Sequence, residues 1–191
     1  NSNGQLRDTF WLNAIGPEYI SLAFQWARAA DPNASLYFAE SGLEQPGRKN
    51  DTLLALLKNL KIKKIPVNGL EFQLNLELGD IPAPSQLANI LKKYAQAGFD
   101  IRLSEIAVRL KMPVTEEKLL KQGDKYQRLM TACLAVARCR AFTLWGFTDA
   151  YYMFPDQYPD YADPFLFDKN YLPKPAYFGL YQALIESHLA V

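Results

Sequence analysis

The sequence predicts a parallel α/β sheet with flanking helices, and three observations lead to this fold class. Short apolar segments with β propensity alternate along the chain with longer amphipathic segments. The strand-like segments recur about every 30–40 residues, the size of a strand–helix unit. They are apolar rather than strictly alternating, as buried parallel strands are. Strands are predicted over residues 35–39, 67–79, 100–110 and 141–147, and helices over 16–30, 51–64, 85–98, 115–138 and 174–190.

Local signals predict where several of these elements begin and end. Pro17 favours a helix start because its fixed φ suits the first turn. Asp51 is the expected N-cap of the second helix. Gly98 is the expected left-handed residue after the third helix. Gly123 is expected to interrupt the helix over 115–138, since glycine weakens a helix interior.

Composition limits the class of protein. The chain has 191 residues, with 49% hydrophobic and 21% charged, which predicts a globular protein of one domain, or two at most, over 1–191. The formal net charge of +1 gives no argument for nucleic acid or membrane partners. No apolar run approaches the ~18 residues of a membrane span, and no signal peptide is visible. No glycine-rich phosphate loop follows a strand, so no nucleotide cofactor is expected.

Polar residues near the carboxyl ends of the predicted strands are the candidates for a site, because parallel α/β proteins bind ligands there. They combine carboxylates, amides and an indole, a set that suits a sugar. One histidine, His188, and the spacing of the two cysteines leave no metal-ligand set, so no metal is expected. The candidates are Glu40, Ser41, Glu44, Gln73, Asn75, Ser104, Glu105, Trp145 and Asp149.

Each candidate also has a purely structural explanation. Glu105 lies in an apolar strand and could equally be an acid paired with Arg102 or Arg109. Trp145 taken alone is more often a core residue than a sugar platform. Two amides on one strand face, Gln73 and Asn75, can be buried and hydrogen-bonded to each other's neighbours. Glu40 and Glu44 are expected to be solvated loop residues. The two cysteines allow a short-loop disulfide or two buried thiols.

Taken together, these residues resemble the C-terminal half of glycoside hydrolase family 10, the endo-β-1,4-xylanases. The resemblance covers essentially the whole chain and implies strands five to eight of a (β/α)8 TIM barrel. The motifs follow the family's order: "LRDTFWLNAIGPEYISLAFQWARAADPNASLYFAE" after the fourth strand, "VNGLEFQLNL" for the sixth, "IRLSEIAVRL" for the seventh, and "FTLWGFTDAYYMF" with "FDKNYLPKPAYFGLYQAL" for the eighth strand and last helix.

The resemblance implies a role for each matching position. Glu105 falls on the nucleophile of a retaining endo-1,4-β-xylanase. Gln73 falls on the active-site glutamine, Asn75 on a further substrate-binding position, and Trp145 on the tryptophan under the sugar at the scissile bond. Cys133 and Cys139 fall where many members of the family have a local disulfide. The implied substrate is a xylan-like polysaccharide and the implied location is secreted.

The departures from the family cluster at the same site. Asn75 replaces the family's histidine, and Ala107 replaces the aspartate that orients that histidine. The family's Asn-Asp-Tyr-Asn run is "AESG" here, over 39–42, and Met153 stands where a second tryptophan is expected. The family's acid/base glutamate belongs to its fourth strand, before the first residue of this chain.

Two hypotheses follow. A retaining glycosidase needs two carboxyl groups about 5–5.5 Å apart, and Glu40 is a poor replacement for the second, two strands away. The chain is therefore expected to be inactive or very weak alone and to work with a complementary half-barrel. Alternatively, it is a non-catalytic fragment that self-assembles into a homo-oligomer and at most binds sugars. Open edges near Tyr37 and Leu144, and interior side chains with no opposite wall, lead us to expect exposed apolar patches.

Overall fold

The computed structural model describes residues 1–152 and 157–189. In this part of the chain four parallel strands pair in sequence order: β1 (Tyr37–Ser41), β2 (Gly69–Glu77), β3 (Asp100–Lys111) and β4 (Cys139–Leu144). A short strand, β5 (Tyr161–Ala162), pairs antiparallel with the end of β3. The predicted parallel α/β fold class is confirmed, and β1 and β4 are the edges of the parallel sheet.

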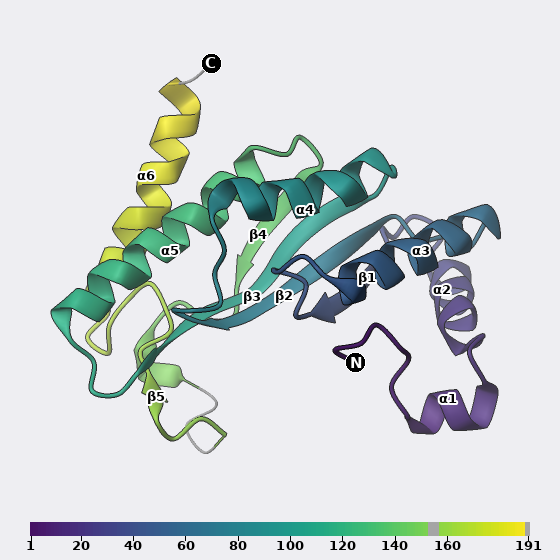
Figure 1. The fold of residues 1–191 in the computed structure, drawn as a ribbon, viewed down its shortest axis with the longest axis horizontal. Helices are drawn as coiled ribbons and strands as arrows, with labels where there is room; N and C mark the ends of the chain where they lie inside the picture. The colour runs from purple at the N-terminus through teal and green to yellow at the C-terminus, as the bar shows by residue number, and fades with distance from the viewer. Residues whose placement is uncertain (153–156, 190–191) are drawn as a thin grey trace.

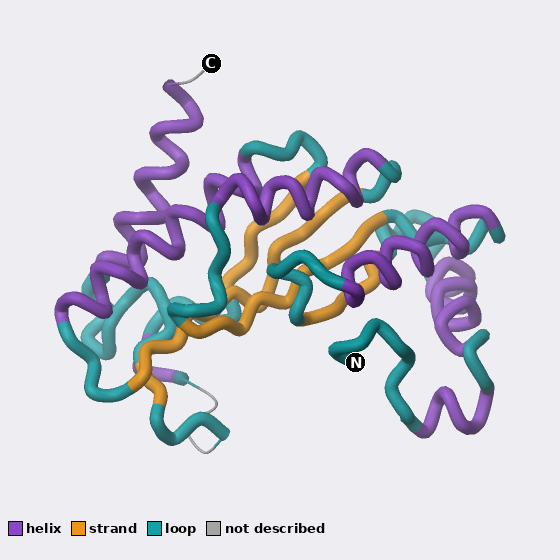
Figure 2. The backbone as a smooth tube through the Cα atoms, viewed as in Figure 1, coloured by secondary structure: helices purple, strands orange, loops and turns teal. Residues whose placement is uncertain are grey.

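Three helices connect the parallel strands and cover one face of the sheet (Figures 1 and 2). They are α3 (Arg48–Ile62), α4 (Pro84–Gln96) and α5 (Glu116–Leu134). Their apolar residues form one continuous core with the sheet, in which Phe72 of β2 packs edge-on against Tyr94 of α4, with ring centroids 5.7 Å apart. This covered face therefore supplies most of the buried apolar surface.

The remaining helices lie at the two ends of the molecule (Figure 1). At one end, α1 (Phe10–Ile15) and α2 (Tyr19–Ala30) precede β1, and at the other α6 (Pro175–Leu189) follows β4 and packs against α5. A single 3-10 turn, η1 (Asp149–Tyr151), lies in the connection between β4 and α6. None of the described helices is both long enough and apolar enough to cross a bilayer.

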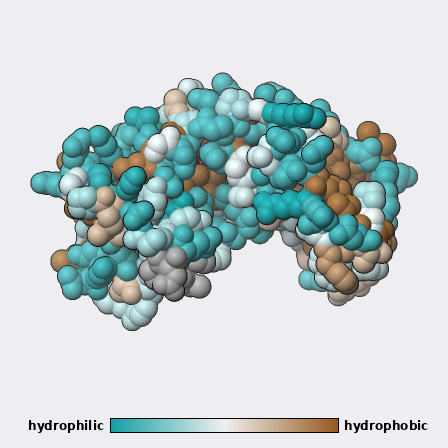
Figure 3. All heavy atoms as spheres, turned by 60° about the horizontal axis from the view of Figure 1, so that its bottom comes forward, coloured by the Kyte–Doolittle hydropathy of each residue, from teal (hydrophilic) through white to brown (hydrophobic). Residues whose placement is uncertain are grey.

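The uncovered face of the sheet is polar. The sequence predicted instead that the strands would be apolar on both faces and that the uncovered face would expose apolar side chains. Along β2 the buried side chains alternate with partly exposed ones, so the strand is not apolar on both faces. The polar set continues on β3, and the uncovered side appears in Figure 3 as a hollow between the two ends of the molecule. Exposed apolar side chains at those ends include Trp11 and Trp26 of α1 and α2, and Phe178 and Tyr181 of α6. The polar residues of β2 are Glu71, Gln73, Asn75 and Glu77.

The structure corrects two predicted helix signals and confirms one. Helix α3 begins three residues early, with Gly47 as its N-cap, so Asp51 lies in the first turn, where the helix dipole favours an acid. Helix α5 is continuous through Gly123. A Cβ there would meet the Pro175 carbonyl oxygen at 2.6 Å, so the glycine serves the crossing with α6. Gly98 has φ +85° and follows α4 as predicted.

A buried ion pair fastens the connection between β4 and α6. The Lys174 ammonium donates to Asp149 Oδ2 at 2.7 Å and to the carbonyls of Asp163 and Phe165. Only 6% of the lysine side chain and 2% of the aspartate side chain are exposed. Burial raises the pKa of Asp149 and lowers the pKa of Lys174, because desolvation disfavours both charged forms and their mutual attraction offsets part of that cost. The pair is structural, so Asp149 is not a ligand-binding candidate.

Cys133 and Cys139 form a disulfide that joins the end of α5 to the first residue of β4. Their Cα atoms are 5.4 Å apart. The two cysteines are 6 residues apart in the sequence, so the disulfide closes a short loop and holds the turn that leads into the edge strand β4.

Lys174→Met should destabilise the fold strongly, because it leaves the Asp149 carboxylate buried without its cation. The expected loss is about 3–5 kcal/mol of unfolding free energy, measured by urea denaturation. Lys121→Met is the matched control, since Lys121 pairs with Glu117 on the exposed surface of α5. Equal effects of the two substitutions would show that the buried pair does not fasten this connection.

Candidate functional site

Glu105 lies at an irregularity inside β3, and not at the end of a strand as the sequence predicted. The pairing of β3 with β4 shifts register between Leu103 and Ile106, and β3 then continues to Lys111. Glu105 has φ +50°, a left-handed conformation that costs a non-glycine residue about 1–3 kcal/mol. Such backbone strain inside a strand is typical of positions where a side chain must be aimed at a ligand.

The Glu105 carboxylate is held by an amide. Gln73 Nε2 on β2 donates to Glu105 Oε1 at 2.8 Å, which brings together two of the predicted site residues from neighbouring strands. Neither arginine proposed as a structural partner holds it. Arg102 stacks on the Tyr37 ring, with its guanidinium carbon 3.8 Å from the centroid, and Arg109 pairs with Glu77. Within the described residues, no lysine or arginine forms a salt bridge with Glu105.

Asn75 lies further along β2, beyond a second irregularity. The register of β2 against β3 shifts between Gln73 and Asn75, and Asn75 then pairs with Ala107. Its side-chain oxygen accepts a hydrogen bond from Arg109 Nη1 of β3. Asn75 alternates with buried residues as Gln73 does, so it lies on the same uncovered side, but it bonds to the arginine and not to Glu105.

Trp145 follows the last residue of β4 and is 38% exposed. Its backbone N–H donates to the Ile106 carbonyl at 3.2 Å, so the residue lies beside the strand position that follows Glu105. A half-exposed indole directly beyond an edge strand is available to a ligand, which a core tryptophan is not.

Two of the other candidates, Glu40 and Ser41, contact Lys49 of α3. Glu40 pairs across the sheet with the buried Phe72, on the helix-covered side, and accepts from Lys49 Nζ of α3 at 2.9 Å. Lys49 also donates to the Ser41 carbonyl. Burial, with a smaller contribution from Asp80, raises the pKa of Glu44, so neither acid is the solvated loop residue that the sequence predicted. His188 is exposed near the end of α6.

Glu71 is a residue of the uncovered face that the sequence reasoning missed. It lies two positions before Gln73 on β2, and its Oε1 accepts from Ser104 Oγ at 2.7 Å. Strict alternation of acid, amide and amide along this strand was the available signal, since alternate residues share a face. Its role in the structure is to hold Ser104, the residue immediately before Glu105.

No metal site accompanies these residues. The part of the chain described by the structure contains no group of three or more histidine, cysteine, aspartate or glutamate side chains that could hold an ion. Met153, where the resemblance led us to expect a second tryptophan, lies outside the described residues.

Comparison with known proteins gives one consistent result. Residues 1–183 match glycosyl hydrolase family 10. Endo-1,4-beta-xylanase 1 of Humicola insolens is 32% identical over 185 residues, which is 96% of this chain and 43% of that protein. Endo-1,4-beta-xylanase B of Thermotoga neapolitana is 33% identical over 187 residues, or 97% of this chain and 54% of that protein. The chain thus spans about half the length of the curated relatives it matches.

Solved structures agree. Native xylanase 10B from Thermotoga maritima superposes with a TM-score of 0.93 at 33% identity, covering 97% of this chain and 57% of that one. Xylanase 10B from Thermotoga petrophila RKU-1, solved in complex with xylobiose, gives a TM-score of 0.93 at 32% identity, with the same coverage.

In a strand, alanine usually gives a more stable protein than glycine. The left-handed backbone at Glu105 predicts the reverse order at this position. Glu105→Gly and Glu105→Ala both remove the carboxylate, but only glycine adopts φ +50° without steric cost. Glu105→Gly should be more stable than Glu105→Ala by about 1 kcal/mol, measured by urea denaturation.

Glu71 provides the matched control, because it lies on the same face in regular β structure. There Glu71→Gly should be less stable than Glu71→Ala by about 0.5–1 kcal/mol. The same order at both positions would contradict the left-handed assignment of Glu105.

Proposed function

This chain belongs to glycosyl hydrolase family 10, and from that premise we propose that it carries the nucleophile of a retaining endo-1,4-β-xylanase acting on xylan. One observation carries the assignment. Glu105 is held in a left-handed conformation on the uncovered face, with its carboxylate bonded to Gln73 and Trp145 exposed beyond the next strand. These are a nucleophile, an amide that orients it and a stacking surface for a sugar ring.

The chemistry assigned to Glu105 needs a second carboxyl group. One oxygen of Glu105 forms a bond to the anomeric carbon as the glycosidic C–O bond breaks, and the leaving oxygen takes a proton from a general acid. Water then attacks the glycosyl-enzyme intermediate, gives a proton to that same group and releases Glu105. Gln73 holds the nucleophile in place by donating to one of its oxygens.

Within the described residues, neither Glu40 nor Glu71 fits the role of the acid. Glu40 belongs to the opposite, helix-covered side of the sheet and is paired with Lys49. Glu71 lies on the uncovered face but towards the amino-terminal end of β2, and it is engaged by Ser104. We therefore propose that a complementary half-barrel supplies the acid/base, and that the isolated chain is inactive or very weak.

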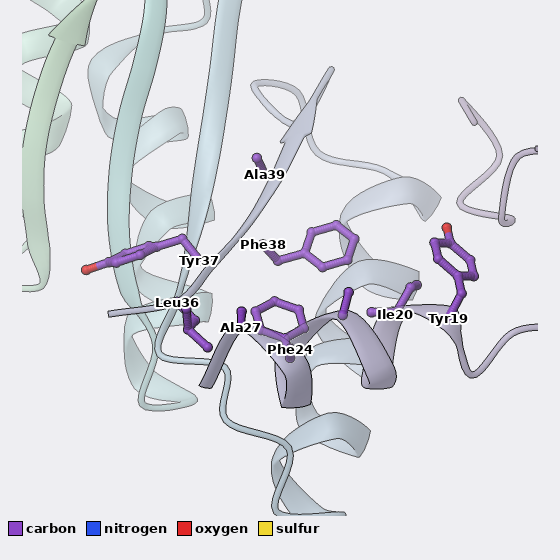
Figure 4. Close-up of a pocket in the computed structure, with 9 residues that line it drawn as sticks. Tyr19, Ile20, Phe24, Ala27, Leu36, Tyr37, Phe38 and Ala39 are labelled. Atoms are coloured by element: carbon purple, nitrogen blue, oxygen red, sulfur yellow. The ribbon is translucent and has the colours of Figure 1, made fainter. Parts of the chain in front are cut away.

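The β1 edge offers a surface for such a partner. An apolar groove of about 380 Å³ lies between α2 and β1, beside the free edge of the sheet. Figure 4 shows Phe24 of α2 and Phe38 of β1 pointing into it, while Tyr37 points away, across the sheet. The groove is not at Glu105, so its proposed role is to pack a neighbouring strand and not to bind substrate.

The opposite end offers a second apolar surface. On α6, Phe178, Tyr181 and Leu184 are 55%, 52% and 41% exposed and share one side of the helix at spacings of three residues. This helix follows the β4 edge as α2 precedes the β1 edge. Each free edge thus has one apolar helix beside it.

Counting helices favours a complementary partner over a second copy. In the described residues five helices, α2 to α6, accompany four parallel strands, leaving aside the six-residue α1. A closed barrel has eight strands and eight outer helices. Two copies would bring α6 of one and α2 of the other to the same seam, one helix too many at each. A partner with four strands and three helices fills both seams.

A non-catalytic role is the second candidate, and one observation favours it. By the resemblance, Asn75 and Ala107 replace the family's histidine and aspartate. The Asn75 side chain contacts Arg109 and not Glu105. A chain of this kind would self-associate through its apolar ends and bind sugars weakly.

We also propose that the protein is secreted. The Cys133–Cys139 disulfide supports an oxidising compartment, because cytosolic thiols are usually kept reduced.

Activity tests separate the two candidate functions. The purified chain should hydrolyse xylan negligibly, because general acid catalysis typically contributes about 10²–10⁴-fold. An aryl β-xylobioside with a good leaving group needs little protonation, so any residual activity should be found there and should disappear in Glu105→Ala. Glu117→Ala, on the exposed surface of α5, is the control. Robust xylan hydrolysis by the chain alone would refute the need for a partner, and aryl-glycoside activity that survives in Glu105→Ala would remove the nucleophile assignment.

The apolar ends predict association. By light scattering at micromolar concentration the chain alone should be larger than a monomer, since both edges are uncovered. Co-expression with the amino-terminal half of a family member should give a 1:1 complex instead. Phe24→Asp in the groove should abolish that complex, whereas Lys58→Asp, exposed on α3, should leave it intact. A stable monomer that ignores the added half would rule out both forms of association.

A further inference from the structure

Arg109 is a buried cation with a specific set of partners. Only 6% of its side chain is exposed, although it lies on the uncovered face of the sheet near the end of β3. Its guanidinium contacts the Asn75 side-chain oxygen through Nη1 and lies 3.6 Å from Glu77 Oε1 through Nη2. One amide oxygen and one carboxylate oxygen therefore hold the guanidinium, from Asn75 and Glu77 of β2.

Aromatic rings fix the same guanidinium from the other side. Its central carbon lies 3.8 Å from the centroid of Tyr158 and 5.7 Å from that of Tyr161. Tyr161 belongs to β5 and also donates to Glu77 Oε2 at 2.8 Å. β2, β3 and the β5 segment thus converge on Arg109, and a guanidinium held on its face and its edge has little freedom to turn.

The chemistry of arginine determines how the Asn75 amide is turned. A guanidinium has donors and no acceptor, so the Asn75 atom that faces it must be the oxygen and not the nitrogen. With that oxygen occupied, the NH₂ group is the part of the side chain left for a ligand. Across the strand pair stands Ala107, which offers no side-chain acceptor for that NH₂ group.

We propose that Arg109 is a positioning residue that fixes Asn75 as a hydrogen-bond donor in the sugar site. The proposal rests on the proposed function for its ligand, a sugar hydroxyl. An ionised Glu105 only accepts, so a hydroxyl bound to it gives away its single proton and needs a donor at its own lone pairs. Asn75 and Gln73, two amides of one strand, supply donors on either side of the shift in register.

An isosteric pair of substitutions at position 75 tests the orientation without any sugar. Asn75→Asp keeps an oxygen towards Arg109 and strengthens the contact, so stability should be retained or increased. Asn75→Leu has the same size but no oxygen, and should lower the folding equilibrium constant at least about tenfold, because a buried charge loses a hydrogen bond. Both are measured by urea denaturation.

The difference between the two variants should depend on Arg109. In an Arg109→Met background Asn75→Asp and Asn75→Leu should be far closer in stability, since non-additivity reports direct coupling. Arg128→Met is the control background, because Arg128 pairs with Asp124 on exposed α5 and should leave the difference intact. If Asn75→Asp is as destabilising as Asn75→Leu, or if the coupling is absent, Arg109 does not hold the oxygen and the proposal fails.

Sugar binding tests the donor. By NMR titration with xylobiose, Asn75→Asp should weaken binding about tenfold or more, although the protein is no less stable. A merely structural contact predicts unchanged affinity, and that result would overturn the donor role. If the wild type does not bind xylobiose, both the proposed sugar binding and the donor role of Asn75 are refuted. The stability measurements still decide whether Arg109 orients the Asn75 amide.

Discussion

The irregularity in β3 is the constraint on which the site depends. Pairing of β3 with β4 shifts register between Leu103 and Ile106, and Glu105 takes up the change in a left-handed conformation. Strain of about 1–3 kcal/mol persists only where the surroundings determine the backbone. β3 has that support, because it pairs with β2, β4 and β5 and its buried side chains belong to the main core.

The hydrogen bonds of the buried Lys174 also support the site, because they hold the segment that follows β5. Its ammonium binds carbonyls at 163 and 165, while Tyr126 and Gln122 of α5 bind carbonyls of the same stretch. That stretch follows β5 directly, so fixing it also fixes Tyr161 against Arg109. The buried Lys174–Asp149 pair therefore supports Tyr161, whose ring lies near Arg109, and Arg109 in turn contacts Asn75 of β2.

Much of this arrangement was predictable from the sequence, and what was not has identifiable physical causes. Periodicity and turn residues gave the strands and the parallel order, because burial is periodic. Gly123 was misread, since the sequence does not show that Pro175 crosses the helix there. Glu105 was placed at a strand end because a shift in register leaves no mark in hydrophobicity. The contacts of Arg109 depend on which strand residues face each other, which only the three-dimensional pairing decides.

The resemblance to the family implies a histidine where this chain has Asn75, and an amide needs something different from its neighbours. A histidine titrates near pH 6.5 and must have its tautomer and charge set by an acceptor, which a carboxylate at position 107 could do. An amide does not titrate, so it needs orientation and no proton control. Arg109 provides that orientation from the same strand as Ala107, two residues further on. Ala107 is therefore compatible with an ordered amide at position 75, and that amide keeps the same hydrogen-bonding character at every pH at which the protein is folded.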